Sequence, residues 1–191
     1  TEVERAAIEK LKPYIISVGV WKKRKGFEYS LPAFSEIVRR FPKLNYVVVG
    51  SGPKPHLAAP LGISDRMFHY KGIRWPFMKA LYKNAELFML LPQNYAGDVE
   101  GFGFAFLEAA AAGLPVIGTL DSGAEDAIRD KVNGFLVEPQ NIHAAAEAAM
   151  LVLGDPILKR KFSAASLEFA RRMNWESVVL SYTALYEDLC K

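Results

Sequence analysis

The sequence contains a single cysteine, Cys190, one residue from its C-terminal end. A disulfide framework is therefore excluded, and the reducing cytoplasm is the expected compartment. The chain has only three histidines, at positions 56, 69 and 143, and their spacing does not match that of metal ligands. We accordingly expect no metal site built from histidine and cysteine.

Long hydrophobic runs and a strong charge bias are also absent. The longest apolar stretch, Phe102 to Gly118, is interrupted by Glu108 and by Gly113-Leu114-Pro115, so it falls short of the roughly 18 residues that a membrane span needs. The net charge is only +3, which does not indicate a nucleic-acid-binding protein. The chain starts at Thr1 without an initiator methionine or a signal-peptide pattern, as expected for a piece of a longer protein.

The 191 residues, of which 51% are hydrophobic and 24% charged, suit one folded domain over residues 1–191. Short apolar runs recur between helical patterns and are nearly continuous rather than alternating, which is typical of parallel strands covered on both faces. The predicted strands are Tyr14–Val18, Tyr46–Val49, Met67–Tyr70, Leu87–Leu91, Pro115–Ile117 and Phe135–Val137.

Helical patterns separate these strands and then take over after Pro139. The predicted helices are Phe27–Arg40, Arg74–Lys83, Phe104–Ala112, Ile142–Leu153, Pro156–Met173 and Trp175–Leu189, with a charged lead-in at residues 1–12 and the closing helix within 174–190. The alternation predicts an α/β fold with a Rossmann-like, doubly wound parallel sheet of about six strands and helices on both faces. Helix Phe104–Ala112 is apolar nearly all round, so we expect it to be buried.

In a doubly wound sheet, ligands bind beyond the carboxyl ends of the strands, where the strand order reverses. The loop that ends in Glu100-Gly-Phe-Gly-Phe-Ala-Phe-Leu-Glu108 reaches this edge. Gly101 and Gly103 let a ligand approach the backbone, and the first amides of the next helix suit a diphosphate. Glu108 can then accept hydrogen bonds from ribose hydroxyls, and Glu100 can face a sugar. Simple tight packing does not explain two carboxylates beside an apolar helix.

A basic loop, Gly19-Val-Trp-Lys-Lys-Arg-Lys-Gly26, follows the first strand. Lys25 can reach a phosphate in the same crevice, but a solvated surface lysine is an equally good interpretation. Solvent exposure is the favoured interpretation for the other three cations. The segments Val49–Pro53, Ser122–Asp126 and Asn133–Val137 are interpreted as turns and helix starts. The complete glycine fingerprint of a nicotinamide-binding oxidoreductase is missing.

Together these segments resemble the C-terminal domain of retaining, nucleotide-sugar-dependent glycosyltransferases of the GT-B fold. The similarity is to the large "group 1" family, which includes bacterial mannosyl- and glucosyltransferases. Its central element is the Glu-x7-Glu motif Glu100–Glu108, which continues to Thr119. Further matches, in chain order, are Val49–Pro53, Tyr70–Gly72, Leu81–Tyr82, Ala85–Phe88, Asn133–Val137 and Asn174–Ser177.

The resemblance implies roles for individual residues. It assigns Glu100, at the donor sugar, and Lys25, at the phosphates, to catalysis. It assigns donor binding to Glu108, at the ribose, and to the backbone or glycines at Phe102, Gly103, Phe104, Gly101, Ile73, Gly72 and Gly19. It implies no metal and no cofactor besides the donor substrate, a UDP-, GDP- or ADP-sugar. Val20 departs from the family, which usually has arginine there, so Lys22, Lys23 or Arg24 is left as a substitute.

The resemblance further implies a metal-independent transfer of a hexose to a glycan, a lipid-linked acceptor or a small molecule. An N-terminal domain of the same parent chain, absent here, would bind the acceptor, so this fragment alone is expected to transfer sugar poorly or not at all. A parent that is peripheral to the cytoplasmic membrane is compatible with this expectation. The alternative is a non-catalytic nucleotide-sugar-binding or regulatory module, which Val20 favours.

Overall fold

The computed structural model describes residues 2–52 and 57–190, so Thr1, Pro53 and His56 lie outside the described residues. In this part of the chain, six strands form one sheet. They are β1 (Tyr14–Val18), β2 (Asn45–Val49), β3 (Met67–Tyr70), β4 (Phe88–Met89), β5 (Val116–Thr119) and β6 (Gly134–Val137). All six predicted strands are confirmed. β4 is shorter than predicted, although Leu87, Leu90 and Leu91 beside it are buried.

The sheet is parallel throughout and its strand order is β3-β2-β1-β4-β5-β6. The chain winds outward from β1 in one direction and then from β4 in the other. The order therefore reverses between β1 and β4, where Ile16 pairs with Phe88. This confirms the predicted doubly wound topology and locates the crevice in which such sheets bind ligands.

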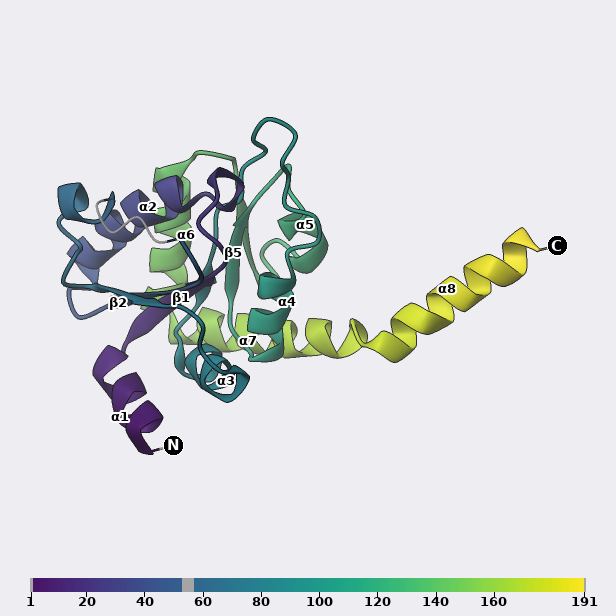
Figure 1. The fold of residues 1–191 in the computed structure, drawn as a ribbon, viewed down its shortest axis with the longest axis horizontal. Helices are drawn as coiled ribbons and strands as arrows, with labels where there is room; N and C mark the ends of the chain where they lie inside the picture. The colour runs from purple at the N-terminus through teal and green to yellow at the C-terminus, as the bar shows by residue number, and fades with distance from the viewer. Residues whose placement is uncertain (1, 53–56, 191) are drawn as a thin grey trace.

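Helices cover both faces of the sheet, as Figure 1 shows. They are α1 (Glu2–Leu11), α2 (Phe27–Arg40), α3 (Trp75–Asn84), α4 (Phe104–Ala111), α5 (Ala124–Ala127), α6 (Ile142–Gly154), α7 (Pro156–Arg172) and α8 (Trp175–Leu189). Short 3-10 helices occupy Lys23–Lys25 (η1) and Ala59–Leu61 (η3). On one face α2 packs against α6, and on the other α4 packs against α7.

The core lies between these layers because the strands have apolar side chains on both faces. Ile15, Ile16, Val47, Phe88 and Ile117 are all completely buried. This arrangement explains the continuous apolar runs, since a parallel strand between two helical layers has no solvent-facing side.

The sequence predicted a buried helix, but α4 is buried on one side only. Phe106, Ala109 and Ala110 face the core, but Phe104 is 65% exposed and Glu108 is half-buried. The apolar composition hid this asymmetry because one side of α4 borders a cavity instead of packing closely against another helix. That open side carries the second glutamate of the Glu-x7-Glu motif.

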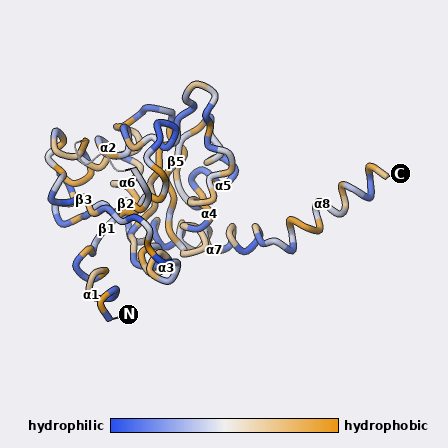
Figure 2. The backbone as a smooth tube through the Cα atoms, viewed as in Figure 1, coloured by the Kyte–Doolittle hydropathy of each residue, from blue (hydrophilic) through white to orange (hydrophobic). Residues whose placement is uncertain are grey.

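The C-terminal helix α8 projects from the rest of the domain in Figure 1. Asn174 caps its start by accepting a hydrogen bond from the Ser177 backbone amide at 2.8 Å, as its sequence position predicts. None of its side chains is buried. Figure 2 shows apolar and polar residues alternating along it.

Candidate active site

The predicted basic loop lies where the strand order reverses, between β1 and β4. Residues 23–25 form the single 3-10 turn η1, and the Arg24 carbonyl accepts a hydrogen bond from the Gln93 amide at 2.8 Å. Gln93 follows β4, so the loops after the two central strands are joined by their backbones. The topology brings Lys25 and Glu100 together, although they are 75 residues apart in the sequence.

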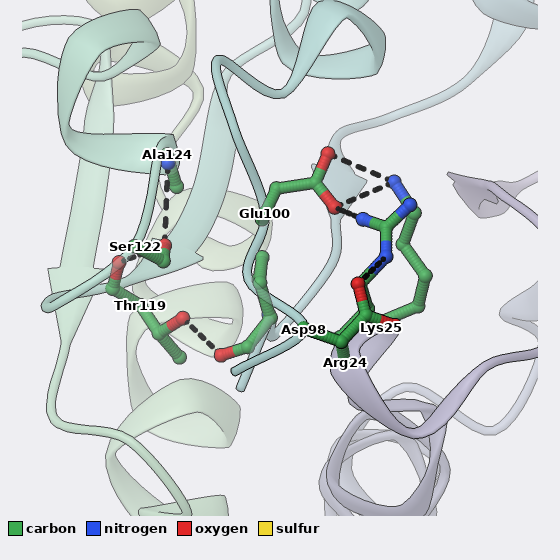
Figure 3. Close-up of polar contacts among 8 residues, drawn as sticks. Arg24, Lys25, Asp98, Glu100, Thr119, Ser122 and Ala124 are labelled. Carbon is green, nitrogen blue, oxygen red and sulfur yellow. Dashed lines mark hydrogen bonds and ion pairs between the residues drawn. The ribbon is translucent and has the colours of Figure 1, made fainter. Parts of the chain in front are cut away.

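Glu100 is the centre of a charged cluster (Figure 3). The Lys25 ammonium donates to Glu100 Oε1 at 2.9 Å and lies 2.8 Å from Oε2. The Arg24 guanidinium donates to Oε2 through Nη1, and its Nε lies 3.1 Å from Asp98 Oδ1. Two cations and two carboxylates thus meet between the loops that follow β1 and β4.

The Glu100 side chain is only 7% exposed. A carboxylate at that depth is stable only when cations and hydrogen-bond donors compensate its charge. Lys25 and Arg24 supply that compensation. Lys25 is therefore not a solvated surface lysine, because its side chain is only 12% exposed and its ammonium group contacts a carboxylate.

Gly19 makes room for the Lys25 side chain. A Cβ atom built at Gly19 would lie 3.3 Å from Lys25 Cδ and Cε, closer than side chains normally pack. The neighbouring Val20 is 46% exposed and brings no charge to the site. Gly19 therefore contributes to the predicted site indirectly, because it leaves room for the aliphatic part of the Lys25 side chain.

The start of α4 has the features expected of an anion site. Gly103 precedes the helix with a φ of +72° and has no side chain to cap the first amides. The first amides of a helix lack partners within it and lie at the positive end of its dipole. The rings of Phe102 and Phe104 flank this turn, edge to face with centroids 5.4 Å apart, and Gly101 is exposed in front of it.

Glu108 points toward α3. Its Oε2 accepts a hydrogen bond from the Tyr82 hydroxyl at 2.9 Å. Burial, and secondly the charge on Glu108, raise the pKa of Tyr82, so this hydroxyl remains a donor throughout the physiological pH range. The hydrogen bond uses one carboxylate oxygen.

The space beside Glu108 is a cavity of about 410 Å³ between α3 and α4. It is lined by Trp75, Lys79, Tyr82, Lys83, Glu108, Ala111 and Ala112. Trp75 is 51% exposed, and the Lys79 ammonium lies 5.5 Å from the centre of its ring. An aromatic face, an aliphatic wall and a carboxylate suit a ring system that carries hydroxyl groups.

The predicted residues Gly72 and Ile73 form the loop between β3 and α3, next to the Trp75 end of this cavity. Gly72 is exposed with a φ of +61°, while Ile73 packs against the core. Among the described residues, no hydrogen bond or ion pair joins Glu108 to the Glu100 cluster. The candidate site thus has two parts, one in the loop that precedes α4 and one between α3 and α4.

Sequence reasoning missed the role of Gly123, in a segment interpreted only as a helix start. The Gly123 amide donates to the Glu100 carbonyl at 3.0 Å, and a Cβ at position 123 would lie 1.3 Å from the Gly101 oxygen. Gly123 thus lets the loop that carries Glu100 rest on the end of β5. A small residue directly before a predicted helix at this sheet edge was the available signal.

Among residues 2–52 and 57–190, no cluster of three or more histidine, cysteine, aspartate and glutamate side chains is placed to hold a metal ion. None of the described helices is both long and apolar enough to cross a bilayer.

Solved glycosyltransferase structures are similar to this chain. Sucrose-phosphate synthase from Thermosynechococcus elongatus is 26% identical, with a TM-score of 0.79 over 99% of this chain and 49% of that one. The crystallised C-terminal domain of a glycosyl transferase group 1 family protein from Francisella tularensis is 23% identical. There the TM-score is 0.72, and the match covers 90% of this chain and 91% of that one. The expected GT-B-type, Rossmann-like fold is confirmed.

A curated relative is the GDP-mannose-dependent alpha-(1-6)-phosphatidylinositol monomannoside mannosyltransferase of Mycolicibacterium smegmatis. It is 30% identical over 152 residues, which is 76% of this chain and 40% of that protein. The chain thus spans less than half the length of this relative. The family model for glycosyl transferases group 1 matches residues 1–169. The chain belongs to the group 1 glycosyltransferase family.

Proposed function

We propose that this chain is the donor-binding domain of a retaining glycosyltransferase that transfers a hexose from a UDP-, GDP- or ADP-sugar. The observation that carries the proposal is the two-part site on α4. A cationic cluster lies in the loop before the start of α4, and the Glu108 carboxylate on α4 lies beside a cavity that Trp75 and Tyr82 help to line. This is the arrangement that a diphosphate with a sugar at one end and a nucleoside at the other requires.

In the proposed reaction, the bond between the anomeric carbon and the diphosphate breaks through an oxocarbenium-like state. Negative charge then grows on the departing diphosphate. The Lys25 ammonium and the first amides of α4 are fixed donors that stabilise this charge without having to reorganise. In this proposal, these groups stabilise the negative charge in place of a metal ion.

The two glutamates have different tasks in this proposal. Glu100, held by Lys25 and Arg24, faces the donor sugar and stabilises positive charge that develops there. Glu108 binds the ribose hydroxyls through the carboxylate oxygen that Tyr82 does not occupy. Gly72 and Ile73 present their backbone to the base at the other end of the cavity.

A second domain of the same parent chain would supply the acceptor site. Helix α8 supports this part of the proposal because it projects from the body with large apolar side chains exposed, among them Trp175 at 77% and Leu180 at 70%. Contiguous apolar exposure of this kind marks a surface that packs against another protein surface. Without that domain, the fragment binds donor but transfers sugar poorly.

Calorimetric titration with the three nucleoside diphosphates and their sugars tests the proposal. We expect one base to bind, and Glu108→Ala to weaken binding by roughly tenfold through the lost ribose hydrogen bonds. Glu147→Ala, which removes an exposed carboxylate from α6, is the matched control. Binding that ignores the base and survives Glu108→Ala would contradict the proposal.

The runner-up, a binding or regulatory module without catalysis, rests on Val20, which brings no charge where the family usually has arginine. It predicts the same titration results but no transfer of sugar. If the full-length parent transfers sugar and its Glu100→Gln variant does not, the enzyme is favoured over the binding module.

A further inference from the structure

The three basic residues of η1 each contact one short segment, which we call the strap and define as residues 94–100. The Lys23 ammonium donates to the Tyr95 hydroxyl at 2.9 Å. Arg24 contacts Asp98 and Glu100, and Lys25 contacts Glu100. Successive cations thus meet successive polar groups of the strap, which lies across the surface where the phosphates are proposed to bind.

The strap is fixed at its ends. The Asn94 side chain donates to the Asp121 carbonyl at 2.7 Å, and the Glu100 carbonyl accepts from Gly123. Between these points the chain closes on itself through two backbone hydrogen bonds between Tyr95 and Asp98. Ala96 and Gly97 form the tip of this small hairpin, and Asp98 belongs to the pair that closes it, with a side chain that is 54% exposed.

Arg24 differs from its neighbours in how it is held. Its Nε faces the exposed Asp98, while its Nη1 faces the buried Glu100. A guanidinium carries five donors in one plane, so these two contacts leave further N–H groups unused. The pair with Asp98 lies in contact with water, and such exposed pairs are weak and easily exchanged for a stronger anion.

We infer that Arg24 is the second cation of the diphosphate site, and that Asp98 holds it in place until a diphosphate displaces the aspartate. Lys25 keeps its contact with Glu100, and Arg24 pivots on Glu100 so that its Nε side turns from the carboxylate of Asp98 to a phosphate oxygen. Charge-assisted arginine–phosphate contacts favour the exchange. Arg24 would then supply the charge that Val20 cannot. This inference rests on the proposed function.

Titration of the whole 191-residue chain with inorganic pyrophosphate and with nucleoside diphosphates tests the inference. Amide NMR suits the weak pyrophosphate complex, and about 0.15 M salt limits long-range charge effects to roughly 8 Å. We expect Arg24→Met to weaken both ligands by roughly tenfold. Arg24→Lys should recover part of the loss, because it restores the charge but not the planar fork. Lys22→Met is the matched control, since it removes an exposed positive charge from the same loop.

The aspartate is tested by a double-mutant cycle. Asp98→Asn should tighten pyrophosphate by about threefold when Arg24 is present and have no effect in the Arg24→Met background. Urea unfolding of each variant confirms that it is folded. Any of three results would overturn the inference. They are no binding of pyrophosphate, equal losses of affinity for Arg24→Met and Lys22→Met, or an increase in affinity from Asp98→Asn that persists without Arg24. A nucleoside diphosphate that binds no better than pyrophosphate and ignores Glu108→Ala would instead overturn the proposed function.

Discussion

At the residue scale, the hydroxyl of Tyr82 occupies Oε2 of Glu108 and leaves the other oxygen for ligand. Removing it with Tyr82→Phe keeps the buried ring but lets the carboxylate rotate. We expect nucleoside diphosphate affinity to fall by roughly three- to tenfold and the free energy of unfolding by about 1 kcal/mol. Calorimetry and urea denaturation measure the two effects.

The 2′,3′-dideoxy form of the same nucleotide separates positioning from packing. Its affinity should be the same for wild type and Tyr82→Phe, because the hydroxyls that Glu108 would bind are missing. Tyr186→Phe, which removes the hydroxyl of an exposed tyrosine on α8, serves as the control. Equal weakening of both nucleotides would mean that Tyr82 only supports the fold.

At the element scale, His143 joins α6 to α2. Its Nδ1 lies 3.0 Å from Glu36 Oε2, and its Nε2 lies 3.4 Å from Glu147 Oε1. The hydrogen bond to Glu36, and then the charge of Glu147, raise the pKa of His143. A raised folded-state pKa gives stability that is fully present below the unfolded value, about 6.5, and is lost as the pH rises through the folded value.

Urea midpoints of wild type and His143→Gln should therefore differ most near about pH 6 and converge by about pH 9. Measuring the difference between the two proteins cancels the titration of all other groups. A difference that stays constant over this range would show that packing, not protonation, accounts for the effect of His143.

At the scale of the whole molecule, α8 contributes no buried side chain to the domain. Ending the chain after Met173 should therefore change the free energy of unfolding by no more than about 1 kcal/mol, and it should reduce self-association by removing exposed apolar surface. Urea denaturation and sedimentation velocity test both effects. A large loss of stability would show that α8 supports the fold although its side chains are exposed.

Much of this architecture could be predicted because its causes are local. Continuous apolar runs predicted the buried parallel strands, and Asn174 predicted the start of α8. The open side of α4 could not be predicted, since composition does not show which neighbour a helix lacks. The contact between Tyr82 and Glu108 and that between Arg24 and Asp98 also join residues far apart in the sequence, and the second depends on β1 lying beside β4.

The long separation between the two halves of the Glu100 cluster couples the site to folding. Arg24 and Glu100 are 76 residues apart, so their contact forms only after β1 and β4 have paired. Contacts of such high contact order form late, and a partly folded chain holds neither the cluster nor the crevice. A ligand of this site therefore binds only the completed sheet, and it stabilises the native state by an amount that rises with ligand concentration relative to the dissociation constant.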